Sequence, residues 1–178
     1  IKVMTGAGVT GAVPGGDNVA VTVAKEGAEE VLNCEKVLVA IGVRSNIEDI
    51  GLESMSIAVQ DGGIQVDDVM RTNVANVYAI GDVTGKLALA HVASAQGITA
   101  VEHMAGLEPQ ALDYVLMPRA TYCNPQVASF GLTETQARER GYSIKIGRFP
   151  FAASGKALAL GETEGMVKLV VDSEIGEI

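Results

Sequence analysis

The chain has few basic residues, only two cysteines and no long uninterrupted run of apolar side chains. Its 13 Lys and Arg residues stand against 22 Asp and Glu residues, which gives a formal net charge of -9. Such a balance offers no basic surface to neutralise a phosphate backbone, so we expect no nucleic-acid partner. No apolar run approaches the roughly 20 residues that span a bilayer, and no basic signal-peptide start follows Ile1. We therefore expect no membrane association, and a cytoplasmic protein, or one of the mitochondrial matrix in a eukaryote.

The two cysteines form no recognisable chemical motif. Cys34 and Cys123 lie far apart, and neither belongs to a Cys-x-x-Cys pair or to a cluster of His and Cys residues. The spacing therefore indicates neither a redox pair nor a zinc site, and we expect no metal site. We expect both cysteines to be buried thiols.

What the sequence does contain is typical of a folded α/β protein. The hydrophobic fraction is 48%, and 21 of the 178 residues are glycine, which suits a compact chain with many tight turns. This length allows one good-sized domain or two small ones.

The N-terminal part predicts a β-hairpin or meander followed by a buried strand. The expected strands cover residues 1–5, 9–13, 18–25 and 36–41. Turns are expected at Pro14–Asn18 and at Glu26–Glu30, where Gly, Pro and charged residues gather. The run Lys36–Ile41 is continuously apolar after its first residue, which is typical of a strand buried on both faces.

A glycine motif near the N-terminus resembles a dinucleotide-binding loop but lacks its context. Gly6, Gly8 and Gly11 match the pattern GxGxxG. The phosphate-binding version needs a helix that opens at the last glycine, because that helix supplies free N–H groups and a positive dipole end. Pro14 and the two glycines after it cannot propagate a helix, so we interpret the motif as glycine-rich β structure.

The middle of the chain carries the most informative pattern. An apolar strand is expected at Asn76–Ile80, followed by Gly81 and Asp82, a short loop, and a helix over Leu87–Ala105. Asp82 at the carboxyl end of a buried strand would lie where ligands bind in open α/β sheets, and could accept hydrogen bonds from ligand hydroxyls. The alternative is that Asp82 only satisfies backbone groups of its own turn.

The C-terminal part predicts a second unit. A connector over Leu107–Pro118 precedes strands at residues 120–122, 127–130, 144–149 and 166–171. A helix is expected from Thr133, because Thr133 and Gln136 have capping-box spacing and Gly141 follows as a stop. His103 is expected to face solvent from the preceding helix.

Three segments together resemble the pyridine nucleotide-disulfide oxidoreductases. They are VLVAIGVRSN (37–46), TNVANVYAIGDVTGKLALAHVASAQG (72–97) and ATYCNPQVASFGLTETQARERG (120–141). The second is similar to the family's second flavin motif, and the third resembles the start of its dimerisation domain. The resemblance implies a partial FAD/NAD-binding Rossmann-like region followed by a partial α+β dimerisation domain.

The resemblance also implies cofactor-binding residues. Asp82, with Gly81 before it, would hydrogen-bond the ribityl chain of FAD, and Ala90 would present its backbone to the flavin pyrimidine ring. His91 would be a near neighbour and not a catalyst. Gly42 and Val9 would lie close to NAD, although Val43-Arg44-Ser45-Asn46 stands where many relatives read Arg-x-Pro-Asn.

Other residues of the family's chemistry are not in this sequence. No Cys-x-x-x-x-Cys pair, C-terminal His-Pro-Thr segment or FAD-gripping glycine loop occurs, so no catalytic residue is assigned. We expect a fragment, with residues 1–42 ending an NAD domain, 43–117 returning to an FAD domain and 118–178 beginning an interface domain.

The expected parent is a homodimer that oxidises dihydrolipoyl groups and reduces NAD through FAD, and that joins 2-oxoacid dehydrogenase complexes. The isolated fragment is expected to be inactive. Two alternatives are a piece of a mercuric or glutathione reductase, and a non-catalytic dimerisation module.

Overall fold

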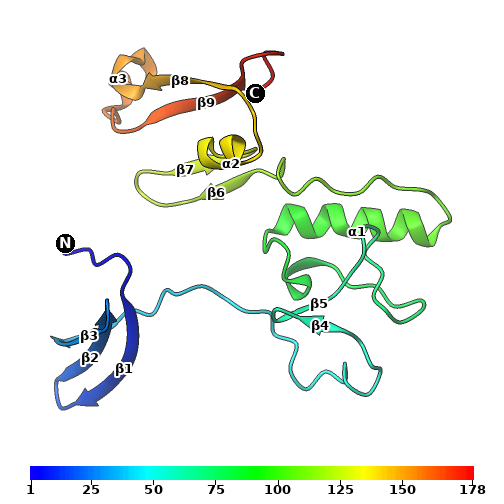
Figure 1. Cartoon of the computed structure of the whole chain (residues 1–178), viewed down its shortest axis with the longest axis horizontal. Helices are drawn as coiled ribbons and strands as arrows, with labels where there is room; N and C mark the ends of the chain where they lie inside the picture. The colour runs from blue at the N-terminus through cyan, green and yellow to red at the C-terminus, as the bar shows by residue number, and fades with distance from the viewer. The chain divides into compact units, whose positions relative to one another are not determined.

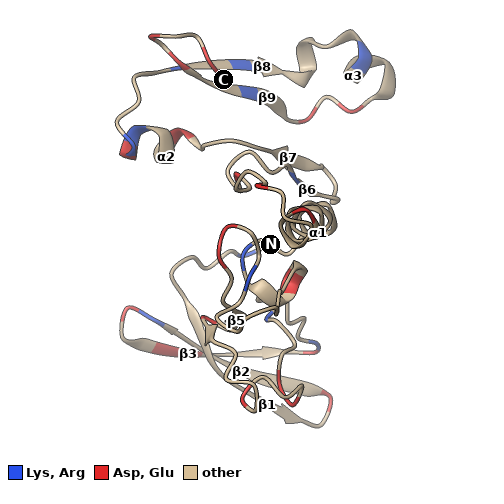
Figure 2. Cartoon of the chain, turned by 90° about the vertical axis from the view of Figure 1, so that its right-hand side faces the viewer, with Lys and Arg blue, Asp and Glu red and all other residues tan.

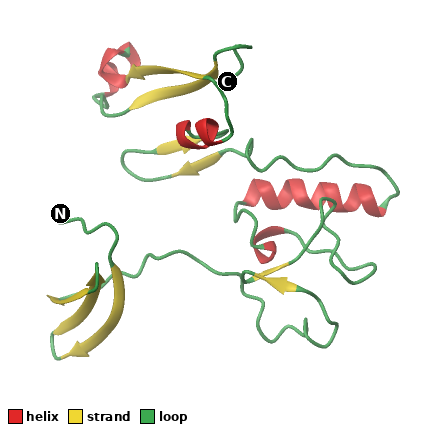
Figure 3. Cartoon of the chain, in the orientation of Figure 1, coloured by secondary structure: helices red, strands yellow, loops and turns green.

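The computed structural model describes residues 1–178, and its contacts divide the chain into two units, Ile1–Val43 and Arg44–Ile178. Each unit is described by itself. Figure 1 shows the order of helices and strands along the chain, and Figure 3 shows how much of the chain between them is loop. Every strand pair is antiparallel.

The first unit is a three-stranded meander. Strands β1 (Gly8–Gly15), β2 (Asn18–Lys25) and β3 (Ala28–Cys34) pair in sequence order, which Figure 1 draws in blue. Val21 and Val23 of the central strand are its buried apolar side chains, because successive residues of a strand point to opposite faces. Gly8 and Gly11 lie within β1, which confirms that the GxGxxG pattern is β structure.

The sequence correctly predicted strands in the middle of this unit but also predicted strands at its two ends that do not form. Residues 1–5 form no strand, and the turn after β2 ends at Gly27, so β3 begins inside the expected turn. Lys36–Ile41 also forms no strand, and Leu38 and Ile41 are 91% and 93% exposed. A strand needs a neighbour for its N–H and C=O groups, and no segment of the chain pairs with these residues.

The second unit begins with a short hairpin over a small core. Strands β4 (Val59–Gln60) and β5 (Gly63–Ile64) are joined by Asp61 and Gly62, both with positive φ, as a two-residue hairpin turn requires. Leu52, Ile64 and Ala79 form the buried cluster beside them. Partly buried Ile47, Ile57, Val66 and Val83 pack against that cluster.

The loop after β5 is closed by the side chain of Asp67. Its Oδ1 accepts hydrogen bonds from the N–H groups of Val69 and Arg71, at 3.0 and 2.9 Å, and its Oδ2 accepts from Arg71 Nε at 2.8 Å. Met70 inside this loop is fully buried with a φ of +67°. The expected strand Asn76–Ile80 is wrong, because only Tyr78 makes a bridge, to Arg71.

The main helix of the unit, α1 (Ala90–Met104), follows the 3-10 turn η1 (Gly81–Thr84). It begins three residues later than expected and ends before Gly106, whose φ of +80° stops it. Its buried residues are Val92, Gln96, Thr99 and Ala100. His103 was expected at the surface, but it is half-buried and its Nδ1 lies 2.8 Å from the hydroxyl of Tyr78.

The C-terminal part consists of two hairpins and two short helices. The elements are β6 (Arg119–Thr121), β7 (Val127–Ser129), α2 (Glu134–Glu139), β8 (Ile144–Pro150), η2 (Phe151–Ala153), α3 (Gly155–Leu160) and β9 (Met166–Asp172). The pairs β6–β7 and β8–β9 agree with the expected strands, whereas α3, capped by Ser154, was not foreseen. Cys34 is half-buried and Cys123 is exposed, so the expectation of two buried thiols is wrong.

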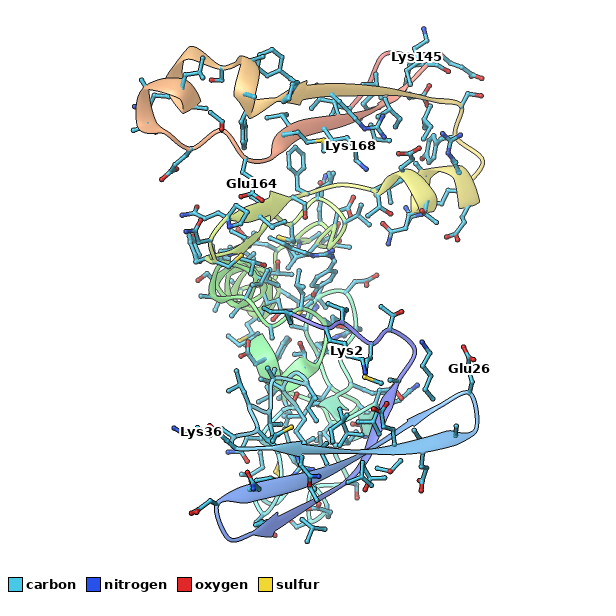
Figure 4. All side chains as sticks on the ribbon, turned by 90° about the vertical axis from the view of Figure 1, so that its left-hand side faces the viewer. Lys2, Glu26, Lys36, Lys145, Glu164 and Lys168 are labelled. Carbon is cyan, nitrogen blue, oxygen red and sulfur yellow. The ribbon has the colours of Figure 1, made fainter.

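A cluster of charges links α2 to the second hairpin. Glu134 carboxylate oxygens lie 3.2 Å from Arg138, 3.4 Å from Arg148 of β8 and 3.7 Å from Lys168 of β9. The hydrogen bond from Arg138 and the three positive charges outweigh desolvation and hold the pKa of Glu134 below its ordinary value. Figure 2 shows these elements carrying both signs of charge, and Figure 4 labels Lys168.

The capping box of α2 is present as the sequence predicts, and it can be tested. Thr133 Oγ1 accepts from the Gln136 N–H at 3.3 Å, and Gln136 Oε1 accepts from the Thr133 N–H at 3.0 Å. We expect Thr133→Ala to lower the free energy of unfolding by about 1 kcal/mol in urea titrations, because an N-cap oxygen is lost. Thr133→Ser keeps that oxygen, so an equal loss in both variants would contradict the assignment.

The Asp67 loop predicts a specific pH dependence. Desolvation raises the pKa of Asp67, but the hydrogen bonds from Arg71 and Val69 outweigh it and hold the pKa below the ordinary value of 3.8. The stabilisation is therefore fully present above that value and is lost as the pH falls through the lower folded-state pKa.

We expect Asp67→Asn, which keeps the Oδ1 acceptor, to reduce stability near neutral pH. The difference from the unmodified chain should shrink as urea titrations are repeated at successively lower pH below about 4. A difference that stays constant with pH would show that Asp67 contributes only through its shape.

Candidate functional site

The Gly81–Asp82 turn is built on two left-handed glycines. Gly81 has a φ of +78° and Gly85 a φ of +65°, a conformation that residues with a Cβ rarely adopt. Between them, the buried Thr84 donates from Oγ1 to the Gly81 carbonyl at 2.8 Å, and the Gly85 N–H donates to the Asp82 carbonyl at 3.0 Å. The turn is therefore closed by its own hydrogen bonds.

Two residues distant in the sequence hold this turn from outside. Ser45 Oγ donates to the Asp82 carbonyl at 2.8 Å. Gln96 Oε1, from the buried face of α1, accepts the Gly81 N–H at 2.6 Å. These two hydrogen bonds hold the backbone on both sides of the Gly81–Asp82 peptide.

The carboxylate of Asp82 is exposed and makes no hydrogen bond within residues 1–178. The sequence left two interpretations open, a ligand-binding carboxylate or one that satisfies its own turn. The turn is satisfied by the carbonyls of Gly81 and Asp82 and by the hydroxyl of Thr84, so the second interpretation finds no contact to support it. The acceptor oxygens of Asp82 face solvent and are free to bind hydroxyl groups.

The N-terminus of α1 is uncapped. Leu89 at the N-cap provides no side-chain hydrogen bond, and the first intrahelical bond runs from the Ala93 N–H to the Leu89 carbonyl at 3.0 Å. The N–H groups of Ala90, His91 and Val92 therefore have no helical partner. They carry the positive end of the helix dipole, which favours an electron-rich group nearby.

His91 ties this helix start to the connector. Its Nε2 lies 2.9 Å from the carbonyl of Pro118, and because a carbonyl only accepts, Nε2 carries the proton. The exposed imidazole is thus held by a structural contact, which leaves Nδ1 as its acceptor when the ring is neutral.

Val9 and Gly42 lie in the first unit. Val9 is 67% exposed on β1, beside a register shift between Val9 and Gly11. Gly42 is exposed in a loop with a φ of +108°, which only glycine adopts readily. Their assignment to NAD stays a prediction, as do the FAD assignments of Gly81, Asp82, Ala90 and His91.

A hollow of about 610 Å³ is lined in part by Thr84 and Gly85 at the end of the η1 turn and does not include Asp82 or Ala90. Its lining includes Gly63 and the Thr84–Lys86 segment, with Asp67 and Arg71 already paired to each other. Its charges are mixed, and none of the residues assigned from the sequence lines it. One of its lining residues, Gly63, packs directly against the backbone of Thr84 and Gly85 and so supports the turn.

Comparison with protein-family models shows the family of the chain. The model described as pyridine nucleotide-disulphide oxidoreductase matches residues 1–97, and the dimerisation-domain model of the same family matches residues 117–178. The chain belongs to the pyridine nucleotide-disulphide oxidoreductase family. A dimerisation domain in this family supports homodimer formation among its members.

Individual family members are similar along all or most of the chain. The dihydrolipoyl dehydrogenase of Mycobacterium leprae is 51% identical over all of this chain, which covers 38% of that protein. That of Bacillus subtilis is 48% identical over 91% of the chain, which covers 34% of its length. This chain therefore spans little more than a third of the curated relatives it matches.

Solved structures confirm the fold class of partial family domains. LpdA from Mycobacterium tuberculosis matches 94% of the chain with a TM-score of 0.81 and 26% identity, and the chain covers 36% of it. The Cu(II) complex of the HOCl-induced flavoprotein disulfide reductase RclA from Escherichia coli matches 94% with a TM-score of 0.79 and 27% identity, and the chain covers 37% of it. The partial Rossmann-like assignment rests on this likeness, since the chain itself holds no parallel strand pair.

Two further findings concern other kinds of site. The chain contains no group of three or more His, Cys, Asp or Glu side chains arranged to hold a metal ion. None of its helices combines the length and the apolar character needed to cross a bilayer.

Sequence reasoning missed the residues that support the site. Ser45, Gly63 and Gln96 all contact the turn or its flanks, but none belongs to the quoted motifs as a ligand. One signal was available for Gln96, because it falls four residues from both Val92 and Ala100 and so interrupts the apolar stripe of the helix. Ser45 and Gly63 gave no signal, because their contacts are set by the tertiary fold.

Gly63 provides a direct test of the turn's support. A Cβ at this position would lie 2.7 Å from the backbone carbon and oxygen of Thr84, so the turn would have to move. We expect Gly63→Ala to lower the free energy of unfolding by about 1–3 kcal/mol in urea titrations.

Gly147→Ala is a matched control, since its Cβ would meet Leu169 Cβ at an ordinary 3.7 Å. This variant should keep the stability of the unmodified chain within about 1 kcal/mol. Equal losses in the two variants would show that the close approach of Gly63 has no special role.

Proposed function

We propose that this chain is part of a dihydrolipoyl dehydrogenase, the enzyme that oxidises dihydrolipoyl groups and reduces NAD through FAD. The observation that carries the proposal is the identity of about half of all residues, along the entire chain, to dihydrolipoyl dehydrogenases of several bacteria. The two family models match residues 1–97 and 117–178, one after the other along the chain, which supports the same proposal.

The Asp82 turn and the start of α1 fit FAD. An exposed carboxylate without a protein partner can accept hydrogen bonds from the hydroxyls of a ribityl chain. The free N–H groups from Ala90 onward can face the electron-rich pyrimidine edge of the flavin, where the helix dipole stabilises negative charge. Gly81 directly precedes Asp82 and allows the left-handed backbone at the start of this turn. In the first unit, Gly42 and Val9 are proposed to approach NAD.

The chain's share of the chemistry is binding and orientation. FAD, when bound, relays a pair of electrons between a dithiol and NAD. Asp82 would fix the position of the polyol chain, and Ala90 would stabilise charge at the ring edge. Residues 1–178 contain no Cys-x-x-x-x-Cys pair, so thiol exchange would need residues outside this chain, and we propose that the chain alone is inactive.

The wider context follows from the same relationship. The three segments 1–42, 43–117 and 118–178 are proposed as parts of the NAD, FAD and interface domains, with support from the family-model boundary at residue 117. The parent would act as a cytoplasmic homodimer that serves 2-oxoacid dehydrogenase complexes.

A chimera tests this function and the role of Asp82. The 178 residues replace the matched segment of the Mycobacterium leprae dihydrolipoyl dehydrogenase, and the purified protein is assayed for visible flavin absorbance and for NADH formation from dihydrolipoamide. We expect a flavin-containing, active enzyme. Asp82→Ala should weaken flavin retention about tenfold or more, because a charged hydrogen-bond acceptor is lost.

Asp113→Ala serves as the control, since Asp113 lies in the connector and its side chain accepts a hydrogen bond only from the nearby Val115 N–H. A chimera that folds but binds no flavin and forms no NADH would contradict the proposed function. Full flavin retention in Asp82→Ala would contradict the proposed role of that residue.

A second candidate function is a dimerisation module that needs no cofactor. The dimerisation-domain match over residues 117–178 favours it. Sedimentation and absorbance of the 178-residue chain separate the two functions, since a colourless dimer supports the module and bound flavin supports the enzyme part.

A further inference from the structure

Gln96 is a polar side chain in an apolar setting. It is 0% exposed and shares the inner face of α1 with Val92, Thr99 and Ala100. Burying an amide without hydrogen-bond partners costs several times the free energy that its hydrogen bonds would contribute. A buried Gln in a helix core therefore has partners for its polar atoms.

Both ends of the Gln96 amide have a partner in a different segment. Oε1 accepts the Gly81 N–H at 2.6 Å, and Nε2 donates to the hydroxyl of Tyr114 at 2.9 Å. Tyr114 belongs to the connector that follows α1, and Lys86 Nζ lies 5.3 Å from its ring centroid. One side chain therefore joins the turn before the helix to the connector after it.

The contact with Gly81 differs from every other contact of the turn. Ser45, Thr84 and Gly85 all donate to the carbonyls of Gly81 or Asp82. Gln96 is the only side chain that accepts a hydrogen bond from a backbone N–H of the turn. That N–H belongs to Gly81, where the backbone enters the left-handed conformation. The Gly81 N–H opens the 3-10 turn, so it has no partner within η1.

We propose that Gln96 is a positioning residue for Asp82. It holds the Gly81 N–H, sets the entry angle of the turn and thereby aims the Asp82 carboxylate, and Tyr114 fixes the rotamer of Gln96. This inference rests on the proposed function for the statement that Asp82 binds a ligand. The positioning itself is a property of the chain without any ligand.

Amide hydrogen exchange of the ¹⁵N-labelled 178-residue chain tests the positioning. Gln96→Met keeps the length of the side chain but removes both polar atoms. We expect the Gly81 amide to exchange about tenfold faster and its proton resonance to shift, since one hydrogen bond is lost. The Ala100 amide, four residues further along α1, should keep its exchange rate.

Gln96→Glu is the rescue variant. Its carboxylate still accepts the Gly81 N–H, and the Tyr114 hydroxyl can rotate to donate to it. We expect Gly81 protection to return to the original level or above. Tyr114→Phe removes only the second contact and should speed Gly81 exchange by less than Gln96→Met does.

Two results would overturn the proposal. One is an unchanged Gly81 amide in a folded Gln96→Met chain. The other is an equal acceleration at Gly81 and Ala100, which would mean that Gln96 only supports packing. If Gln96→Met does not fold, Tyr114→Phe decides, and an unchanged Gly81 amide in that variant counts against the proposal.

Flavin titration of the same proteins separates this inference from the proposed function. If Gly81 exchange responds as expected but the chimera carrying this segment binds no flavin, the positioning stands and the enzyme assignment fails. If the chimera binds flavin equally well with and without Gln96→Met while Gly81 exchange is unchanged, the enzyme assignment stands and the positioning fails.

Discussion

The hydrogen bond from the Gly81 N–H to Gln96 is the contact on which the candidate site depends. A chain that enters a left-handed turn leaves one N–H pointing away from its own segment, and that group must find an acceptor elsewhere. Here the acceptor comes from the buried face of α1, fifteen residues later. The exposed Asp82 carboxylate and the free helix N-terminus keep their relative orientation because this bond joins the elements that carry them.

The sequence correctly predicted those elements that are stabilised by residues close to one another in the chain. The hairpin turn before β2, the capping box of α2, the glycine stops of α1 and α2 and the strands β8 and β9 all follow from short-range rules of turn chemistry and alternation. The order of Gly81–Asp82 turn and following helix was also predicted, but the strand expected before Gly81 is absent, and the exposure of Asp82 was not predicted.

Elements that need a distant partner were the ones predicted wrongly. Lys36–Ile41 and Asn76–Ile80 have the composition of buried strands, but composition does not provide the neighbouring strand that pairs with their backbones. His103 was misplaced for a related reason, because its contact is Tyr78, twenty-five residues away in the sequence. The supporting contacts of Ser45 and Gly63 are likewise set by the fold and leave no mark in the local sequence.

The exposed segment Val37–Ile41 has a consequence for the behaviour of many copies of the chain. It is a window of five apolar residues without charge or proline, and its backbone N–H and C=O groups have no strand beside them. Such windows are templates for intermolecular β pairing, in which identical segments of separate molecules stack in register. We expect self-association through this window, and it would grow with concentration and shorten the lifetime of the dissolved chain in crowded surroundings.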